Sequence, residues 1–411
     1  MSFPRYPTYK DSGVEWLGEV PGHWDVKRLK RNMHLLTEKT DRRDHPVALE
    51  NIEGWTGRFI TTETEFQGEG IAFEPDDILF GKLRPYLAKA YRAEFSGEAV
   101  GDFHVMRPVT GINSRFVQYQ ILNREFISIV DGSTFGSKMP RASWEFVGDM
   151  LVTTPLLPEQ TQIAAFLDRE TAKIDALVEE QRRLMALLKE KRQAVISHAV
   201  TQGLNPHAPM KPSGIEWLGD VPEHWDVVPL RWAAKCCSGD GLSSTEVESN
   251  ADDEHTVRVI GGNGLMGYTD QENVNHSLLA VGRVGALCGN VHVVHAPAWI
   301  TDNALVLDPD ASIFDLQFLS MTLRSRNLND IASKTAQPLI TGTQVSDQRI
   351  PCPPLSEQEA IAAYLTEESA KFDTLTTEAQ RAIDLLQERR TALISAAVTG
   401  QIDVRGTVES L

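Results

Sequence analysis

Cysteine is scarce in this sequence, and it contains no long apolar run. The four cysteines, Cys236 and Cys237 side by side with Cys288 and Cys352 apart, form neither a disulfide framework nor the paired CxxC pattern of a zinc knuckle. No apolar run approaches the roughly 18 residues that a membrane-spanning helix needs. The first residues also lack the basic and apolar regions of a signal peptide. We therefore expect a soluble, cytoplasmic protein that binds no metal and has no membrane partner.

Positive charge is also in short supply. The 411 residues include 40 Lys and Arg against 57 Asp and Glu, which gives a formal net charge of −17. The deficit is uneven, because residues 27–152 hold 17 basic and 18 acidic side chains whereas residues 228–350 hold 8 and 14. Phosphate binding requires local positive charge and not a positive total, so the composition excludes only a uniformly basic nucleic-acid binder.

The chain is an internal duplication of a unit of about 200 residues. Residues 12–26 recur as residues 213–227 with twelve of fifteen positions identical, including Trp-Leu-Gly and Val-Pro-x-His-Trp. Residues 158–201 align without gaps on residues 356–399. The stretches between these blocks have diverged almost completely, so we expect two different domains on a retained frame.

The second repeated block of each half predicts a long helix. It opens after prolines, and its apolar residues then recur at spacings of mainly three, four and seven, as in a coiled coil. We predict one long helix within 153–203 and one within 351–402, each with about 40 helical residues or roughly 60 Å. We expect them to pack as an antiparallel pair about a pseudo-twofold axis, with two separate helical hairpins as the alternative. The residues predicted to pack in the helix pair or against partner subunits are Ile163, Leu167, Ile174, Leu177, Leu184, Leu188, Ile361, Leu365, Phe372, Leu375 and Leu386.

Each diverged region predicts a compact mixed domain. Short β-rich runs within 47–110 and 256–308 are broken by Gly, Asn and Asp, and residues 114–130 and 312–331 are expected to be helical. The fold class is therefore mixed α/β, with two globular domains separated by two long helices. The predicted order is a repeated segment (1–26), a first domain (27–152), a central helix (153–203), a linker with the second repeated segment (204–227), a second domain (228–350), a C-terminal helix (351–402) and a tail (403–411).

Known catalytic motifs are missing from the sequence. We find no P-loop, His-Glu-x-x-His, Gly-x-Ser-x-Gly elbow or Asn/Asp-Pro-Pro-aromatic tetrad of adenine methyltransferases. Residues 262–267 match G-x-G-x-x-G, but no apolar periodicity follows, so a Gly-rich β-turn is favoured over a dinucleotide site. Asp76, Asp77 and Lys82 faintly resemble a nuclease constellation, a pattern that arises by chance in most chains of this size. We predict a non-catalytic chain that binds no cofactor of its own.

The repeated blocks together resemble type I restriction-modification specificity subunits, over essentially the whole chain. That resemblance implies two target-recognition domains separated by two spacer helices. It also implies double-stranded DNA as a partner, together with two adenine-N6 methyltransferase subunits and restriction/translocase subunits. S-adenosylmethionine, ATP and Mg²⁺ would then be bound by those partner subunits. The residues that carry the resemblance, besides the Trp-Leu-Gly and His-Trp blocks, are Leu157-Pro158-Glu159-Gln160, Leu355-Ser356-Glu357-Gln358, Val200-Thr201 and Val398-Thr399, with Ser356 departing from Pro158.

Two stretches inside the diverged domains still align between the halves. Residues 78–86 and 279–285 each place a base just after an apolar strand and a glycine, where backbone can approach DNA closely. Residues 136–141 likewise align on residues 334–339. We interpret both as turns that present DNA contacts; the alternative is that Gly and Pro only shape the turns and the bases are solvated. The predicted DNA-binding residues are Lys82, Arg84, Tyr86, Ser137, Lys138, Arg141, Arg283, Lys334 and Gln337.

Two unlike domains on a pseudo-dyad frame predict a bipartite, asymmetric DNA target. Half-sites of about 3–5 bp, centred about 10 bp apart, would leave roughly 6 bp unread. The helices would then set the spacing and hold the partner subunits. The competing hypothesis is a coiled-coil assembly scaffold that does not read DNA, but two diverged domains on a retained frame favour recognition.

Overall fold

A computed structural model divides the chain into two units. The first consists of residues 1–182 and 380–411, and the second of residues 183–379. Each unit thus contains one diverged domain and part of each long helix. Within the described residues, no helix combines the length and apolar character needed to cross a membrane. The structure describes residues 3–42, 44–62, 68–136, 138–333 and 337–406.

The two units are built from short elements in a similar order, with η marking a 3-10 helix. The first contains β1 (Tyr9–Asp11), β2 (Glu19–Pro21), β3 (Asp25–Arg28), α1 (Leu29–Asn32), β4 (Met33–Leu36), β5 (Lys39–Thr40), β6 (Pro46–Val47), η1 (Leu49–Asn51), β7 (Gly70–Phe73), β8 (Ile78–Gly81), η2 (Pro85–Leu87), β9 (Ala90–Arg92), β10 (Gly97–Val100), β11 (Phe103–Pro108), α2 (Ser114–Ile121), α3 (Arg124–Gly132), α4 (Trp144–Asp149) and β12 (Leu151–Thr154). The second contains β13 (Met210–Pro212), β14 (Asp220–Pro222), β15 (Asp226–Pro229), η3 (Leu230–Trp232), β16 (Ala234–Ser238), η4 (Ser244–Glu246), β17 (Val257–Gly261), β18 (Gly264–Thr269), β19 (Leu278–Gly282), β20 (Val291–Val294), β21 (Ala298–Ile300), β22 (Ala304–Pro309), α6 (Leu316–Arg326), η5 (Leu328–Ile331), α7 (Gly342–Ser346) and β23 (Arg349–Cys352). The long helices, with parts in both units, are α5 (Leu157–Gln202) and α8 (Leu355–Val398).

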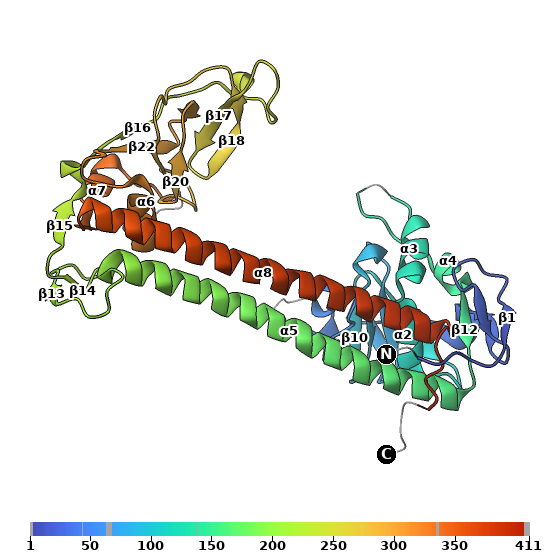
Figure 1. Cartoon of the computed structure of the whole chain (residues 1–411). Helices are drawn as coiled ribbons and strands as arrows, with labels where there is room; N and C mark the ends of the chain where they lie inside the picture. The colour runs from blue at the N-terminus through green and yellow to red at the C-terminus, as the bar shows by residue number, and fades with distance from the viewer. Residues whose placement is uncertain (1–2, 43, 63–67, 137, 334–336, 407–411) are drawn as a thin grey trace. The chain divides into compact units, whose positions relative to one another are not determined.

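Helices α5 and α8 run antiparallel, as predicted (Figure 1). In the first unit, Arg390 of α8 donates to Asp175 of α5 at 3.1 Å. In the second unit, Arg192 of α5 donates to Asp373 of α8 at 2.6 Å. The end of each helix therefore lies beside the beginning of the other, which confirms the expected helix pair.

Each diverged domain has its own four-stranded main sheet, and the two sheets have equivalent strand orders. The strand order is β4-β11-β8-β9 in the first domain and β16-β22-β19-β20 in the second. Strands β8 and β19 are buried at every position, as expected of strands covered on both faces. A smaller sheet in each domain contains one parallel pair, β6 with β10 and β17 with β21. The strand order of the main sheet has thus been retained although the sequences between the repeated blocks have diverged. The smaller sheets differ, with order β5-β7-β10-β6 in the first domain and β18-β17-β21 in the second.

The predicted helical stretches and the Gly-rich turn are present. Residues 114–130 form most of α2 and α3, and residues 312–331 include α6 and η5. Residues 262–263 form the turn of an antiparallel hairpin between β17 and β18, and residues 264–267 are the first residues of β18. A helix does not open there, so this segment has the β-turn structure that the sequence favoured over a dinucleotide fingerprint.

The repeated histidine and tryptophan attach each domain to the helices. His23 Nε2 lies 2.9 Å from Glu159 Oε2, and His224 Nε2 lies 2.9 Å from Glu357 Oε2. The next residue in each case is a fully buried tryptophan, which belongs to the core at the end of α8 in the first unit and of α5 in the second. The repeated block therefore joins the start of one long helix to the end of the other.

The glutamine that follows each of these glutamates completes the connection. Gln160 Oε1 accepts the N–H of Asn113 and Gln358 Oε1 accepts the N–H of Asp315, both at 2.9 Å. Asn113 and Asp315 are the N-cap residues of α2 and α6. Each glutamine also donates Nε2 to the carbonyl of a proline five residues earlier, at 2.8 and 2.9 Å. The repeated Glu-Gln pair thus ties a helix of the domain to the start of the long helix.

Both long helices end at a glycine that packs against the repeated His-Trp block, and we call the block, the Glu-Gln pair and this glycine the joint of each unit. Gly203 follows α5 with φ 77°, and Gly400 follows α8 with φ 76°. A Cβ on Gly203 would lie 3.1 Å from the Trp225 ring, and one on Gly400 would overlap Pro21. Left-handed backbone and close packing both favour glycine at these positions.

The buried stripes of the two long helices differ from the predicted ones at three positions, two on α5 and one on α8. The predicted residues Leu177, Leu184 and Leu375 are 46%, 42% and 46% exposed, so they do not pack within the helix pair. Val178 and Ile383, at 7% and 4%, lie in the stripe. Six predicted residues are buried (Ile163, Leu167, Ile174, Ile361, Leu365 and Phe372) and two are half-buried (Leu188 and Leu386).

The physical reason for these three errors is the helical period. On α5 the buried and half-buried positions advance 36 residues in ten steps, about 3.6 per step. A strict heptad advances 3.5 residues per step and drifts off this stripe. The positions are 163, 167, 171, 174, 178, 181, 185, 188, 192, 196 and 199.

Candidate nucleic-acid interface

In the first unit, the turn after β8 is hydrogen-bonded to the segment that precedes α4. Ala142 N–H donates to Lys82 O at 2.9 Å, and Arg84 N–H donates to Pro140 O at 2.8 Å. We call residues 82–84 and 138–142 together the first paired loop. Lys82 N–H also donates to Asp102 O at 2.9 Å, which ties this loop to the start of β11. Two stretches more than fifty residues apart in the sequence thus form one surface.

The second unit contains the same arrangement, formed by residues 283–285 and 337–340, which we call the second paired loop. Ile340 N–H donates to Arg283 O at 2.9 Å, and Gly285 N–H donates to Pro338 O at 2.9 Å. Arg283 N–H donates to Asn303 O at 3.0 Å. These three bonds connect the residues that the internal alignment of the sequence pairs with those of the first loop. The two domains therefore present different side chains on equivalent backbone.

Asp102 holds two basic side chains of the first paired loop. Arg141 donates Nε and Nη2 to the two carboxylate oxygens of Asp102, at 3.0 and 2.9 Å. Lys82 Nζ lies 3.9 Å from Asp102 Oδ1. The hydrogen bond and the charge of Asp102 raise the pKa of Arg141 above its usual range. The guanidinium is thus fixed in orientation and stays charged.

The other predicted residues of the first paired loop and its flank are exposed. Arg84 has a left-handed backbone with φ 52°, and Gly285, at the equivalent position of the second paired loop, also has a positive φ of 88°. Among the described residues, the side chains of Arg84 and Lys138 make no hydrogen bond or ion pair. Tyr86 is 46% exposed. The loop therefore presents two unpaired cations, a held arginine and an aromatic ring to solvent.

Arg283 is the described basic residue of the second paired loop. Its Nη1 donates to Ser238 Oγ at 3.1 Å and reaches the carbonyl of Asp302 at 3.5 Å. Asn303 and Leu339 stand where the first domain has Asp102 and Arg141, so no equivalent ion pair forms there. Gln337 is exposed. The predicted residues Ser137 and Lys334 lie outside the described residues.

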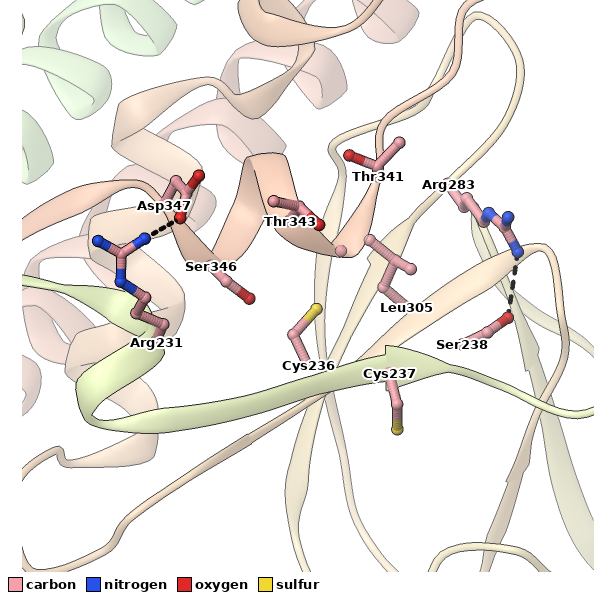
Figure 2. A pocket seen from close by; sticks show the side chains of 11 residues that line it. Arg231, Cys236, Cys237, Ser238, Arg283, Leu305, Thr341, Thr343, Ser346 and Asp347 are labelled. Carbon is pink, nitrogen blue, oxygen red and sulfur yellow. Dashed lines mark hydrogen bonds and ion pairs between the residues drawn. The ribbon is translucent and has the colours of Figure 1, made fainter.

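Arg283 also borders a pocket of about 510 Å³ between β16 and α7. Figure 2 shows the Arg283–Ser238 bond at one end and the ion pair of Arg231 with Asp347 at the other. The Cys236 thiol lies on the α7 side of β16, and burial raises its pKa to about 11, so it is neutral near pH 7. An arginine beside hydroxyl groups is suited to anionic oxygens.

A buried histidine supports the first paired loop from below. His104 Nε2 lies 3.0 Å from Ala142 O. Burial lowers the pKa of His104 below its usual value, so the ring is neutral near pH 7. In that state the tautomer with a proton on Nε2 donates to the carbonyl. His104 therefore helps to position the residue next to Arg141.

Structure adds residues that the sequence analysis missed. Asp102 and Ser238 both contact predicted DNA-binding residues. Extending the alignment of residues 78–86 at the same offset would have set Asp102 opposite Asn303. The two aspartates of the faint nuclease pattern, Asp76 and Asp77, are bound by arginines outside the first paired loop. Asp77 accepts two hydrogen bonds from Arg107, both 2.8 Å, and Asp76 accepts one from Arg92 at 2.8 Å. Their positions thus have a structural explanation in ion pairs.

Comparison with known proteins gives a consistent result. A family model described as the type I restriction modification DNA specificity domain matches residues 238–384. The type I restriction enzyme EcoprrI specificity subunit of Escherichia coli is 32% identical over 142 residues, which cover 34% of this chain and 34% of that relative. The chain therefore matches about a third of that relative's length. The EcoKI specificity subunit of Escherichia coli strain K12 is 22% identical, covering 96% of this chain and 92% of the relative.

One solved structure shows the same fold over nearly the whole chain. It was determined in work on the complex assembly and conformational transition of the type I R-M system. Its TM-score is 0.74 at 17% sequence identity, and the match covers 95% of this chain and 99% of that chain. This likeness confirms the predicted arrangement of two mixed domains and two long helices.

Proposed function

Because the chain belongs to the family of type I restriction-modification specificity subunits, we propose that it gives such a complex its DNA sequence specificity. Each domain reads one half of a bipartite, asymmetric target in double-stranded DNA. The helix pair sets the gap between the halves and docks the partner subunits. The complex acts on DNA in the cytoplasm.

The observation that carries this proposal is the pair of loops with equivalent backbone and different side chains. The backbone hydrogen bonds of the two paired loops agree to within 0.1 Å. Their side chains differ, with Lys82, Arg84 and Arg141 in the first and Arg283, Gly285 and Leu339 in the second. A retained backbone frame that presents different side chains is the arrangement expected where two different base sequences are read.

Local charge answers the objection raised by the net charge of −17. The first paired loop carries Lys82, Arg84, Lys138 and Arg141, and only Lys82 and Arg141 of these pair with a carboxylate, that of Asp102. Such a cluster can contact phosphates although the chain as a whole is acidic. The methyltransferase subunits would supply further phosphate contacts, so the isolated chain is expected to bind DNA weakly.

Exposed leucines on the long helices support docking of two methyltransferase subunits, one on each unit. In the first unit, Leu177 and Leu385 are 46% and 57% exposed. In the second unit, Leu184, Leu187 and Leu375 are 42%, 53% and 46% exposed. Burial of such exposed apolar side chains, repeated at helical spacing, by a partner helix lowers the free energy and so stabilises the complex. Restriction/translocase subunits then add to this core complex.

Recognition and chemistry are divided between subunits in this proposal. The present chain contributes the DNA contacts and the docking surface. Methyl transfer from S-adenosylmethionine belongs to the methyltransferase subunits, and ATP- and Mg²⁺-dependent steps belong to the restriction subunits. The chain itself is therefore a recognition subunit and not an enzyme.

The test is to express the chain together with its cognate methyltransferase subunit and to map N6-methyladenine across the host DNA. We expect a single split motif, with two unlike halves around a fixed unread gap. The methyltransferase subunit expressed alone is the control and should not methylate this motif. A stable complex whose methylation does not depend on this chain would instead favour an assembly scaffold that does not read DNA.

A further inference from the structure

We infer that Arg141, held in place by Asp102, recognises a guanine base in the half-site read by the first domain. This inference rests on the proposed function and adds to it a residue that determines specificity. Asp102 acts through Arg141 and is a positioning residue.

The hydrogen bonds of Arg141 leave a recognition edge free. Arginine has five N–H donors in a fixed plane, and Asp102 occupies one on Nε and one on Nη2. The second hydrogen on Nη2 and one hydrogen on Nη1 then form a free edge with two parallel donors. Two parallel donors on that edge match the O6 and N7 acceptors that guanine presents in the major groove. The Arg141 side chain is 36% exposed, so DNA can reach this edge.

Two other arginines of the first domain, Arg107 and Arg84, are less suited to this role. Arg107 also donates twice to one carboxylate, that of Asp77, but the Asp77 side chain is only 1% exposed. Arg107 Nη2 lies 2.9 Å from Glu74 as well, so two carboxylates surround it. Arg84 is exposed but has no carboxylate to orient it within the described residues. An unheld arginine suits a phosphate contact, whereas base recognition benefits from an orientation set before binding.

The surroundings of Arg141 match a base contact flanked by phosphate contacts. The backbone of Arg141 pairs with Leu83 on one side and Phe135 on the other. Phe135, whose backbone pairs with that of Arg141, leaves its apolar ring 64% exposed. Arg84 and Lys138 are exposed cations of the same paired loop. Positive charge on both sides would hold the DNA backbone while Arg141 reaches a base edge.

The second domain provides an internal comparison. It retains the backbone bonds of the paired loop but has Asn303 and Leu339 in place of Asp102 and Arg141. A neutral amide and an aliphatic side chain cannot form the Asp–Arg pair. The guanine contact is therefore confined to the first domain, and it is one source of the difference between the two half-sites.

The experiment maps N6-methyladenine made by the full chain in complex with its methyltransferase subunits. Four chains are compared: wild type, Arg141→Lys, Asp102→Asn and Arg84→Ala. In the wild type we expect one half-site to contain an invariant guanine. Arg141→Lys keeps the charge but loses the planar two-donor edge, so selectivity for that guanine should fall roughly 5- to 150-fold. Asp102→Asn should relax the same position to a smaller degree and leave every other position unchanged.

Arg84→Ala is the matched control from the same loop. It should lower methylation of all sites together without relaxing any one base position, because a phosphate contact carries no sequence information. A general folding defect in the Asp102 or Arg141 variants would also lower all sites together, so relaxation of a single position distinguishes base recognition from a structural role.

The outcomes separate this inference from the proposed function. A wild-type split motif that stays unchanged in Arg141→Lys would refute the guanine contact alone. Relaxation at a base other than guanine would refute it as well. A wild-type complex that methylates no split motif would overturn the proposed function and this inference together.

Discussion

Replacement of Gly400 by alanine should destabilise the first unit through two separate costs. Gly400 has φ 76°, and an L-residue held in the left-handed region costs about 1–2 kcal/mol. The new Cβ would also overlap Pro21 and lie 3.0 Å from the Trp24 ring. Overpacking of a well-packed core costs typically about 1–3 kcal/mol more. We therefore expect Gly400→Ala to lower the free energy of unfolding by about 2–5 kcal/mol.

Two other glycines separate these costs. Gly18 has φ 60° with nothing within 4 Å of an added Cβ, so Gly18→Ala should lose only about 1–2 kcal/mol. Gly203, the counterpart of Gly400, would place its Cβ 3.1 Å from the Trp225 ring, a contact that a small shift of the ring relieves. Gly203→Ala should therefore fall between the other two variants.

The assay is calorimetric unfolding of the full chain and the three variants in one buffer. For a unit of about 200 residues, each kcal/mol lowers Tm by about 2–4 °C. If Gly400→Ala unfolds at the same temperature as Gly18→Ala, the overlap with Pro21 and Trp24 has no energetic consequence. If both match the wild type, the left-handed backbone is not a constraint either, and the argument fails.

Three further predictions concern the joint, the support of the first loop and the second loop. Gln358→Ala should destabilise the second unit by about 3 kcal/mol, because buried partners of this side chain lose their hydrogen bonds. Gln358→Glu keeps the oxygen that accepts from Asp315 N–H and so measures the loss of the Nε2 donor alone. Equal stability of the wild type and Gln358→Ala in urea titrations would contradict this prediction. The lowered pKa of His104 means that, as pH falls through about 6.5, the unfolded chain binds a proton that the folded chain does not, so stability drops. His104→Gln should therefore show a smaller loss of Tm than the wild type between about pH 7.5 and pH 5.5, and parallel curves would refute this role. Arg283→Ala should reduce the slope of log affinity against log salt by about 1 without changing the methylated motif, and an unchanged slope would remove Arg283 from the phosphate contacts.

Much of the frame could be predicted from the sequence because its signals are local. The repeat, the two helices and the β-rich domains follow from spacing, proline positions and turn residues within short segments. The internal alignment also placed Lys82 opposite Arg283. These two residues make equivalent backbone hydrogen bonds in the first and second paired loops, in agreement with the alignment. Local signals failed where a small error in period accumulates, as at Leu177 and Leu184, which lie outside the buried stripe.

The remaining features depend on contacts between distant segments. Asp102 and Arg141 are 39 residues apart, and His23 and Glu159 are 136 apart. Whether such side chains meet depends on strand register and on the path of the loops between them, which no single segment encodes. The amino-acid pattern was thus sufficient for the duplicated frame and for the family resemblance. The side chains that are free to contact DNA, and those already held by a carboxylate, became known only once the chain was folded, because pairing of charges is a property of three-dimensional proximity.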